Sequence, residues 1–519
     1  MTTNTMTGAE SLVHTLLAGG VDVCFANPGT SEMHFVAALD TIPGMRCILG
    51  LQENVVTGAA DGYARMMEKP AVTLLHLGSG LSNGLANLHN ARRAKTPMVN
   101  VVGEHATYHI KHDAPLTSDI VSIAKPVSDW LATATDPKSV ATLAAEAIEA
   151  CQTSPGGIAT LLLPGDCAWN GGATPAQPKA APAAPLASAE AVENAAQVLK
   201  SGEPTLLFMA HSALREEGLI LGSKITQKTG AEMLAPVSNA RLPRGEGRPL
   251  INRVPYPVDQ ALERLSGFKH IILVGAKEPV AFFAYPGKPG QMAPEGCHIH
   301  VLTTPEQNGV AALQALAEAT EATETEAVTI RLARPDLPKG ELTPDSIAYS
   351  LAALMPDQAI IIDEAVTSGR ALFSFTETCP RHDWLQLTGG AIGIGHALAT
   401  GAAVACPDRK VICLEADGSG MYSPQALWTQ ARENLDITTI IYSNRSYEIL
   451  KGEMKNVGFD HAGPTALSMF DLDNPTIDWP MLAKSMGVDG VRAEDAASFN
   501  AALQQGLATP GPFLIEAVI

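Results

Sequence analysis

The stretch KVICLEADGSGMYSPQALWTQARENLDITTIIYSN, residues 410–444, decides the fold class. Its two apolar runs, KVICLEA and ITTIIYS, are typical of buried strands, and a helix-length segment from Ser423 to Asn434 separates them. Strands that alternate with helices in this way predict a parallel sheet covered on both faces. Asp417 and Asn444 follow the two runs, so we expect them at the carboxyl edge of the sheet, where such folds bind ligands.

The same alternation extends over the whole chain, which at 519 residues is long enough for about three domains. Residues 173–187, ATPAQPKAAPAAPLA, have the proline content of an extended linker. A second, polar stretch at 321–344 leads to Thr343, which can cap a helix through Ser346 to Leu354. These features predict boundaries near 170–188 and 325–342. We therefore expect an α/β protein of three doubly wound parallel-sheet domains, at 1–172, 188–325 and 342–519.

Composition excludes several classes of protein. The formal net charge is −19, so no bulk positive field would attract nucleic acid or an anionic membrane. The eight cysteines include no Cys-x-x-Cys pair, which argues against a thiolate metal site and a disulfide scaffold. The first 45 residues hold no Lys or Arg, and no apolar run approaches the ~18 residues of a membrane span. We expect a cytoplasmic protein.

Asp417 and Asn444 have the chemistry of a magnesium site. Carboxylate and amide oxygens suit a hard divalent cation that holds a diphosphate, and the glycines beside Asp417 let the backbone approach phosphate. The alternative is that Asp417 begins a β-turn and Asn444 caps the next helix, as both residue types often do.

A family resemblance favours the first interpretation. ADGS at 416–419, followed by Asn444, resembles the diphosphate and magnesium motif of thiamine-diphosphate-dependent enzymes. The N-terminal third is similar to the acetolactate synthase and benzoylformate decarboxylase branch of that family, in NPGT (27–30), LQE (51–53), GAADGYAR (58–65) and HLGSG (76–80).

The resemblance implies a pyrimidine-binding, a middle and a diphosphate-binding domain, with thiamine diphosphate and Mg²⁺ as cofactors. It implies metal ligation by Asp417, Asn444 and the backbone carbonyl of Ser446. The implied cofactor-binding residues are Thr30, Thr367, Gly390, Ile392, Asp417, Gly418, Ser419, Asn444 and Tyr447.

Glu53 is the implied catalytic carboxyl group, which bonds the aminopyrimidine of the cofactor. Burial would keep it protonated at neutral pH. His76, 23 residues later, matches an active-site histidine of benzoylformate decarboxylases and could relay a proton. His109 and His112, in the loop GEHATYHIKHDAPL, loosely resemble the histidine pair of pyruvate decarboxylases; the alternative is that they are solvated loop residues.

The implied reaction is decarboxylation of a 2-oxo acid through an enamine intermediate, in a homodimer or homotetramer with active sites between subunits. Acetolactate synthase-like carboligation is the alternative. It is weakened because VGAKEPVAFFAYPGK (274–288) stands where such enzymes carry their FAD-binding run, which makes FAD an improbable cofactor. The substrate-loop tryptophan and glutamine of those synthases are also missing after Asn444.

Two alternatives of other classes arise from short glycine motifs. Gly80-Leu81-Ser82-Asn83-Gly84 fits the nucleophile-elbow pattern of serine hydrolases, with Ser82 as nucleophile. The glycine runs at 78–80 and 393–395 imitate dinucleotide fingerprints but lack the third small residue, so we do not expect NAD binding.

Overall fold

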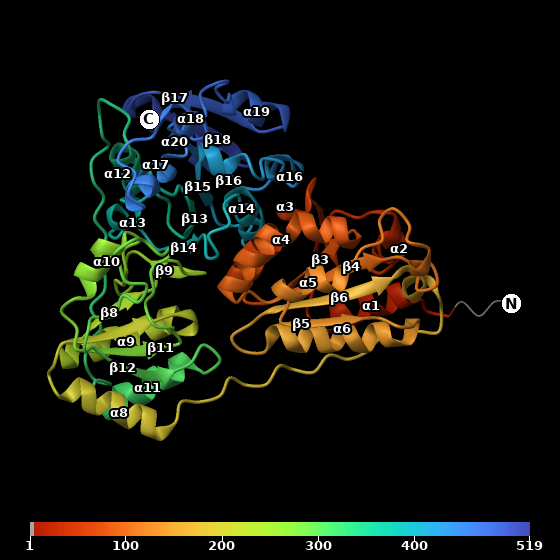
Figure 1. Cartoon of the computed structure of the whole chain (residues 1–519), viewed down its shortest axis with the longest axis horizontal. Helices are drawn as coiled ribbons and strands as arrows, with labels where there is room; N and C mark the ends of the chain where they lie inside the picture. Colours follow the sequence, from red (N-terminus) through yellow and green to blue (C-terminus); the bar gives the residue numbers. More distant parts are fainter. Residues whose placement is uncertain (1–4) are drawn as a thin grey trace.

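The computed structural model describes residues 5–519 and contains three sheets whose strands are parallel with one exception. Figure 1 shows them as three bodies, the N-terminal one joined to the middle one by a long strap. The strap has no helix or strand over residues 174–187, where proline recurs. The predicted α/β class with three parallel-sheet units is confirmed.

The N-terminal sheet has the order β2-β1-β3-β4-β6-β5 and is entirely parallel. Its strands are β1 (Val23–Ala26), β2 (Arg46–Leu49), β3 (Ala71–Leu75), β4 (Met98–Glu104), β5 (Trp130–Thr133) and β6 (Ile158–Pro164). Its helices are α1 (Gly8–Ala18), α2 (Met33–Thr41), α3 (Glu53–Met67), α4 (Leu77–Ala94), α5 (Ile120–Ala124), α6 (Pro137–Gln152) and α7 (Gly165–Trp169), with short 3₁₀ turns η1 (Thr30–Glu32), η2 (Ile110–His112) and η3 (Lys125–Val127).

The middle sheet has the order β10-β8-β7-β11-β12 and is also parallel. Its strands are β7 (Thr205–Met209), β8 (Glu232–Ala235), β10 (Asn252–Arg253), β11 (His270–Val274) and β12 (His298–Thr303). Its helices are α8 (Ala189–Lys200), α9 (Glu216–Thr229), α10 (Val258–Leu265) and α11 (Gly309–Ala319), with the 3₁₀ turn η4 (His211–Leu214).

The C-terminal sheet has the order β17-β18-β16-β15-β13-β14-β9. Its strands are β13 (Ala359–Glu364), β14 (His382–Gln386), β15 (Val411–Ala416), β16 (Ile437–Ser443), β17 (Asp489–Ala493), β18 (Phe513–Val518) and β9 (Leu242–Arg244). Its helices are α12 (Pro344–Leu354), α13 (Leu372–Phe375), α14 (Gly395–Ala405), α15 (Asp417–Gly420), α16 (Ala426–Arg432), α17 (Glu448–Asn456), α18 (Pro464–Ser468), α19 (Trp479–Ser485) and α20 (Ala496–Ala508).

Strand β9 departs from the expected pattern. It comes from the segment between the two predicted boundaries, yet it pairs antiparallel with β14 of the C-terminal sheet. The Arg244 guanidinium stacks on Phe373 and lies 5.6 Å from the Trp384 ring, which ties β9 to the C-terminal core. The pairing covers the edge of β14, whose backbone would otherwise be free to pair with another chain.

Local predictions around the C-terminal sheet can be checked residue by residue. Thr343 caps α12, since its hydroxyl accepts from the Ser346 amide at 3.1 Å, as expected. The helix expected from Ser423 to Asn434 is shorter, because the Ser423 hydroxyl donates to the Gly393 carbonyl oxygen instead of capping, and α16 begins at Ala426.

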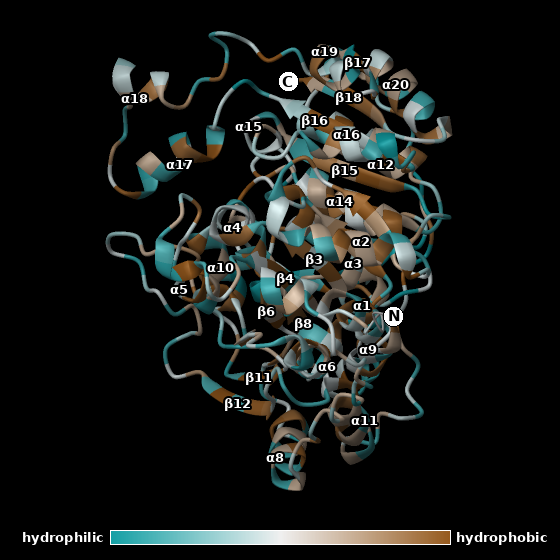
Figure 2. Cartoon of the chain, turned by 90° about the vertical axis from the view of Figure 1, so that its right-hand side faces the viewer, coloured by the Kyte–Doolittle hydropathy of each residue, from teal (hydrophilic) through white to brown (hydrophobic). Residues whose placement is uncertain are grey.

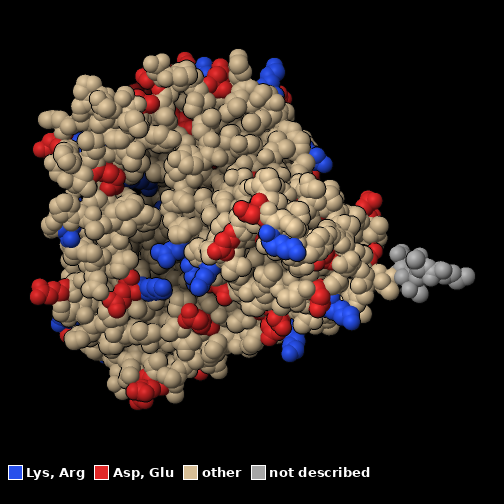
Figure 3. Space-filling model, turned by 45° about the vertical axis from the view of Figure 1, so that its right-hand side comes forward, with Lys and Arg blue, Asp and Glu red and all other residues tan. Residues whose placement is uncertain are grey.

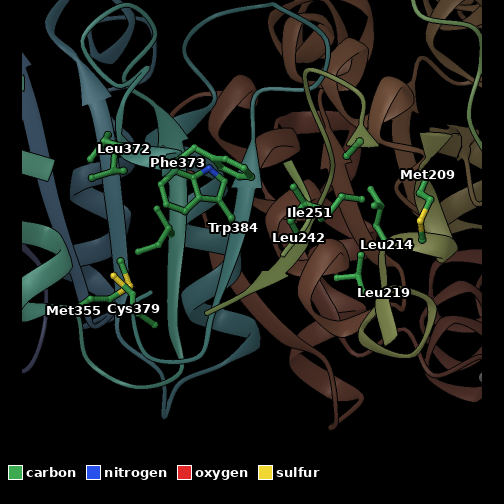
Figure 4. Packing of buried hydrophobic residues seen from close by; sticks show 14 of the residues in the cluster. Met209, Leu214, Leu219, Leu242, Ile251, Met355, Leu372, Phe373, Cys379 and Trp384 are labelled. Carbon is green, nitrogen blue, oxygen red and sulfur yellow. The ribbon is translucent and has the colours of Figure 1, made fainter. Parts of the chain in front are cut away.

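Two continuous apolar cores hold the domains together. Figure 4 shows the first, which extends from Met209 through Leu242 to Trp384 and Phe373. The second core joins the N-terminal and C-terminal sheets through α3 and α14. These helices approach so closely that a Cβ atom at Gly62 or Gly401 would overlap backbone atoms of the facing helix.

Surface features agree with the composition. Figure 2 shows the apolar strands in the interior, and α17 and α18 standing away from the body. Figure 3 shows a face on which charged residues are sparse and basic ones gather around a hollow. Within residues 5–519, no helix combines the length and apolarity that a membrane crossing requires.

Candidate active site

The carboxyl edge of the C-terminal sheet brings Asp417 and Asn444 together. Strands β15 and β16 are parallel neighbours, and Ala416 is the register partner of Tyr442. One Asp417 oxygen accepts from the Gly418 amide at 2.8 Å and the other from the Arg445 amide at 2.5 Å. The Asn444 side-chain oxygen accepts from the Ser446 amide at 3.0 Å. The predicted adjacency of the two strands is therefore confirmed.

Electrostatics at this edge favour a bound cation. Burial raises the pKa of Asp417 to about 6, although two backbone amides stabilise its ionised form. A cation beside the carboxylate would offset that desolvation. Oxygen atoms from Asp417, Asn444 and Ser446 form the kind of ligand set that Mg²⁺ takes together with phosphate oxygens.

A glycine cradle adjoins these oxygens. A Cβ atom at Gly418 would overlap the Tyr447 ring, and one at Gly393 would overlap Tyr422. Gly390 has φ +77°, and a Cβ atom there would lie 2.6 Å from Cζ of Phe282 in the middle domain. The three glycines therefore allow two aromatic side chains and a loop of the middle domain to pack directly against the backbone.

Glu364 holds the 389–395 loop through two hydrogen bonds. Its two carboxyl oxygens accept from the amides of Gly393, at 2.8 Å, and Gly395, at 2.5 Å. Burial raises the pKa of Glu364 to about 7, and burial together with Glu364 raises the pKa of its neighbour Glu415. Sequence reasoning missed Glu364; the signal was a carboxyl group at the carboxyl end of an apolar run.

The buried carboxyl pair has a further neighbour in His396. Its ring is fully buried, and within residues 5–519 neither ring nitrogen has a hydrogen-bond partner. Burial lowers the pKa of His396 to about 4, so the ring is neutral. The cluster therefore carries little charge directly beneath the loop.

Other predicted residues occupy the same edge. Thr367 follows β13 and is half-buried. Glu364 of β13 and Glu415 of β15 are register partners, so Thr367 and Asp417 both lie just beyond that pair. Ile392 is only partly buried, between Gly390 and α14, and Ser419 lies in the single turn of α15.

The N-terminal domain holds the second group of candidates. Glu53 is the first residue of α3, is 8% exposed, and accepts from the Asn83 side-chain amide at 3.0 Å. Gly80 packs directly against Glu53: a Cβ atom at this position would lie 3.0 Å from Oε1 of Glu53.

His76 precedes α4, and its Nδ1 lies 2.8 Å from Oε2 of Glu32. Glu32 is 2% exposed and also accepts from the Gly29 amide at 2.7 Å. Burial raises the pKa of Glu32, with His76 acting in the opposite direction. Sequence reasoning missed this carboxyl group, although it stands only two residues after the NPGT motif.

The remaining N-terminal candidates are exposed. Thr30 begins η1, and His109 and His112 lie on a surface loop with ring centroids 5.5 Å apart. Asp166 fixes this loop by accepting from the Thr107 amide at 2.8 Å. Within the described chain neither histidine hydrogen-bonds to Glu53 or His76.

Comparison with known proteins matches the two parts of the chain that hold these two groups of residues. Residues 6–123 match the model of the thiamine pyrophosphate enzyme N-terminal TPP-binding domain, and residues 367–517 match that of the C-terminal TPP-binding domain. The chain belongs to the thiamine pyrophosphate enzyme family.

Relatives within this family differ in their named reactions. A Mycobacterium tuberculosis protein provisionally named acetolactate synthase large subunit IlvX is 51% identical over 99% of both chains. Benzoylformate decarboxylase of Pseudomonas aeruginosa is 28% identical over 96% of both chains. Among solved structures, the thiamine diphosphate-dependent 4-hydroxybenzoylformate decarboxylase of Rhodococcus jostii superposes with a TM-score of 0.85, at 25% identity and 98% coverage of both chains.

The residues of this family member fit the cofactor that gives the family its name. The donor set of Asp417 and Asn444 suits magnesium and diphosphate, and Gly390 and Gly418 allow the Phe282 and Tyr447 rings to approach the backbone beside it. Ser82, by contrast, is the sixth residue of α4 and sits on no strand-to-helix elbow. The serine hydrolase alternative is therefore wrong.

One chain does not bring both groups of site residues together. Gly80 lies beside Glu53, whereas Asn90, further along α4, donates to the Ala391 carbonyl oxygen at 2.7 Å. Ten residues of helix span about 15 Å. Likewise Arg65, at the far end of α3 from Glu53, donates to the Gln386 carbonyl oxygen at 2.7 Å. Glu53 and the 389–393 loop therefore lie at opposite ends of the helices that connect them.

Proposed function

We propose that this protein is a thiamine-diphosphate- and Mg²⁺-dependent decarboxylase of a 2-oxo acid. The observation that carries the proposal is the pair of oxygen donors, Asp417 and Asn444, at the adjacent carboxyl ends of β15 and β16. The named activities of the Pseudomonas and Rhodococcus relatives support decarboxylation.

The diphosphate end of the cofactor is assigned to the C-terminal domain. Asp417, Asn444 and the Ser446 carbonyl hold Mg²⁺. Thr367 and the amides of Gly418 and Ser419 bind phosphate oxygens. When bound, thiamine diphosphate supplies a nucleophilic carbon and an electron sink for the carboxylate that leaves as CO₂.

The ring end is assigned to residues of both terminal domains. The Gly390 carbonyl and the Ile392 side chain orient the pyrimidine, while Tyr447 and Thr30 lie at the rim. Glu53, which is 8% exposed, would hydrogen-bond to the pyrimidine nitrogen. His76, oriented by Glu32, moves a proton to or from the substrate.

These roles require a second copy of the chain. Glu53 lies about 15 Å, ten residues along α4, from the loop that would bind the other end of the ring. In a homodimer, Glu53 of one protomer meets the loop of its partner. Exposed apolar side chains on the protruding α17–α18 segment support such an interface; Phe459 is 61% and Met469 72% exposed.

The middle domain adds an aromatic wall to the proposed substrate pocket. Phe282 touches Gly390 and packs on Tyr256 and Phe283. Tyr285 donates to Glu453 of α17 at 2.7 Å, which links the loop to the C-terminal domain. An aromatic wall favours a bulky 2-oxo acid over pyruvate.

Acetolactate synthase-like carboligation is the second candidate, because the 51% identical relative carries that provisional name. A product assay separates the two. Purified protein with thiamine diphosphate and Mg²⁺ is offered pyruvate, 2-oxobutyrate, branched 2-oxo acids and benzoylformate, and CO₂, aldehyde and acyloin are measured separately. Aldehyde from a bulky oxo acid supports decarboxylation; acetolactate from pyruvate replaces it with carboligation; no CO₂ from any of them contradicts both.

We further assign residues 1–172, 188–325 and 342–519 to the pyrimidine-binding, middle and diphosphate-binding domains of a cytoplasmic enzyme. The exposed His109 and His112 are proposed to enter the active site only in the dimer. Their replacement by Gln should then reduce turnover without altering cofactor binding, and unchanged turnover would remove them from the site.

A further inference from the structure

Three histidines gather at the amino end of the middle sheet. His270 opens β11 and His298 opens the edge strand β12, and the two are register partners. His300 lies two residues further along β12, so its side chain is on the same face of the sheet. Cofactors of parallel sheets bind beyond the carboxyl ends of the strands, so this cluster lies apart from the candidate active site.

The spacing of two of the rings, His270 and His300, suits a shared ligand. Nδ1 of His270 lies 3.1 Å from Nε2 of His300. Two nitrogens bound to one Zn²⁺ at tetrahedral geometry lie about 3.4 Å apart, given Zn–N bonds of about 2.0–2.1 Å. The His298 ring stacks on His270, with centroids 5.5 Å apart and planes inclined by 25°. Because His298 is exposed, its ring is free to turn toward the other two.

Glu203 orients the central ring. Its Oε2 lies 2.9 Å from Nε2 of His270, and Lys269 holds its other oxygen at 2.6 Å. A carboxylate paired with Lys269 in this way accepts hydrogen bonds. The Nε2 proton of His270 therefore points at Glu203, and the lone pair at Nδ1 faces His300. At metal sites, a ligating histidine usually donates a hydrogen bond from its other ring nitrogen to a carboxylate in this way.

The third ring, His300, presents its Nε2 to Nδ1 of His270 at 3.1 Å. Neutral imidazole is the ligand form, and imidazole suits late first-row metals. The nearby cationic group, Lys269, is neutralised by its ion pair with Glu203.

We propose that His270, His298 and His300 bind a late first-row divalent cation such as Zn²⁺, with Glu203 as the carboxylate that orients His270. In the metal-free protein the Nε2 proton of His300 bridges to Nδ1 of His270. On metal binding that proton moves to Nδ1 of His300, and both facing nitrogens become ligands. The site does not depend on the proposed decarboxylase activity.

The test uses full-length protein without a histidine tag, stripped with chelator and titrated with Zn²⁺ by calorimetry, with Co²⁺ absorption as a second readout. We expect about one equivalent per chain and tetrahedral Co²⁺ bands. Replacing both His270 and His300 by Gln should remove binding. Glu203→Gln, which keeps all three ligands, should weaken it about 10- to 100-fold.

Matched variants locate the metal. His14→Gln changes an exposed histidine on α1 and should leave Zn²⁺ affinity unaltered. Replacement of both His109 and His112 by Gln tests the other exposed histidine cluster and should also leave it unaltered. Circular dichroism confirms that each variant is folded. Unchanged affinity in the double His270/His300 variant, loss of binding in the His109/His112 variant, or no binding at micromolar Zn²⁺ overturns the proposal.

Discussion

Nδ1 of His76 lies 2.8 Å from Oε2 of Glu32, a carboxyl group that is 2% exposed and that also accepts from the Gly29 amide. A buried carboxylate bonded to one ring nitrogen fixes which nitrogen of the histidine carries the proton and how the ring is oriented. In the proposed reaction Glu32 would therefore act through His76 as a positioning residue.

Glu32→Gln should lower kcat by roughly 10- to 100-fold with a smaller effect on KM, because the ring loses its fixed orientation. The pKa of Glu32 is raised by burial, so on acidification it takes up its proton at a higher pH than an ordinary glutamate. As the pH is lowered, the activity of the parent protein should therefore decline at a higher pH than an ordinary glutamate would cause. This decline should be absent in Glu32→Gln. An identical pH profile in both proteins would contradict the role.

Glu53→Gln should lower turnover by about 10²- to 10⁴-fold under saturating cofactor, the usual range for loss of a general acid or base. Cofactor binding should persist, because the proposed phosphate and metal ligands lie in the other domain. Glu193→Gln, an exposed helix carboxyl group, is the matched control. Turnover near that of the parent protein would exclude Glu53.

Asp417→Asn should abolish stabilisation by thiamine diphosphate and Mg²⁺. A ligand present at 100 times its Kd stabilises the folded state by about 2.7 kcal/mol, which thermal unfolding detects readily. The parent protein should melt at a higher temperature with both cofactors, whereas Asp417→Asn should not. Asp408→Asn, an exposed aspartate, should respond like the parent.

Mixing subunits tests whether sites form between chains. Glu53→Gln and Asp417→Asn homodimers should both be inactive. If Glu53 acts on the partner's cofactor, each mixed dimer contains one intact site, and random reassociation should restore about a quarter of the parent activity. No recovery, with mixed dimers demonstrated by mass spectrometry, would indicate sites within single chains.

Gly401→Ala should destabilise the protein by about 1–3 kcal/mol, the usual cost of overpacking, because the new methyl group would overlap the Ala59 carbonyl of α3. Gly452→Ala is the control, since a Cβ atom there meets no atom within 4 Å in the exposed helix α17. Urea denaturation followed by circular dichroism measures both. Equal midpoints for the two variants would show that the helices can separate without cost.

Local patterns in the sequence predicted much of the C-terminal domain. Apolar runs fixed β15 and β16, and the turn residues after them fixed where Asp417 and Asn444 stand, because the carboxyl ends of parallel neighbours meet at one edge. Thr343 capped its helix as expected, since capping depends only on neighbours in the chain. The expected start of the 423–434 helix was wrong because the Ser423 hydroxyl donates to the Gly393 carbonyl oxygen of a distant loop.

The sequence by itself determined the fold class and the family, because these follow from periodicity and short motifs, and it predicted which residues form the site. Only the tertiary structure decided that Glu32 lies behind His76, that β9 joins the C-terminal sheet, and that Phe282 meets Gly390. It also decided that Glu53 stands at the far end of α3 and α4 from the 389–393 loop. These contacts join residues far apart in the chain, and their formation depends on how whole domains pack, which no local pattern encodes.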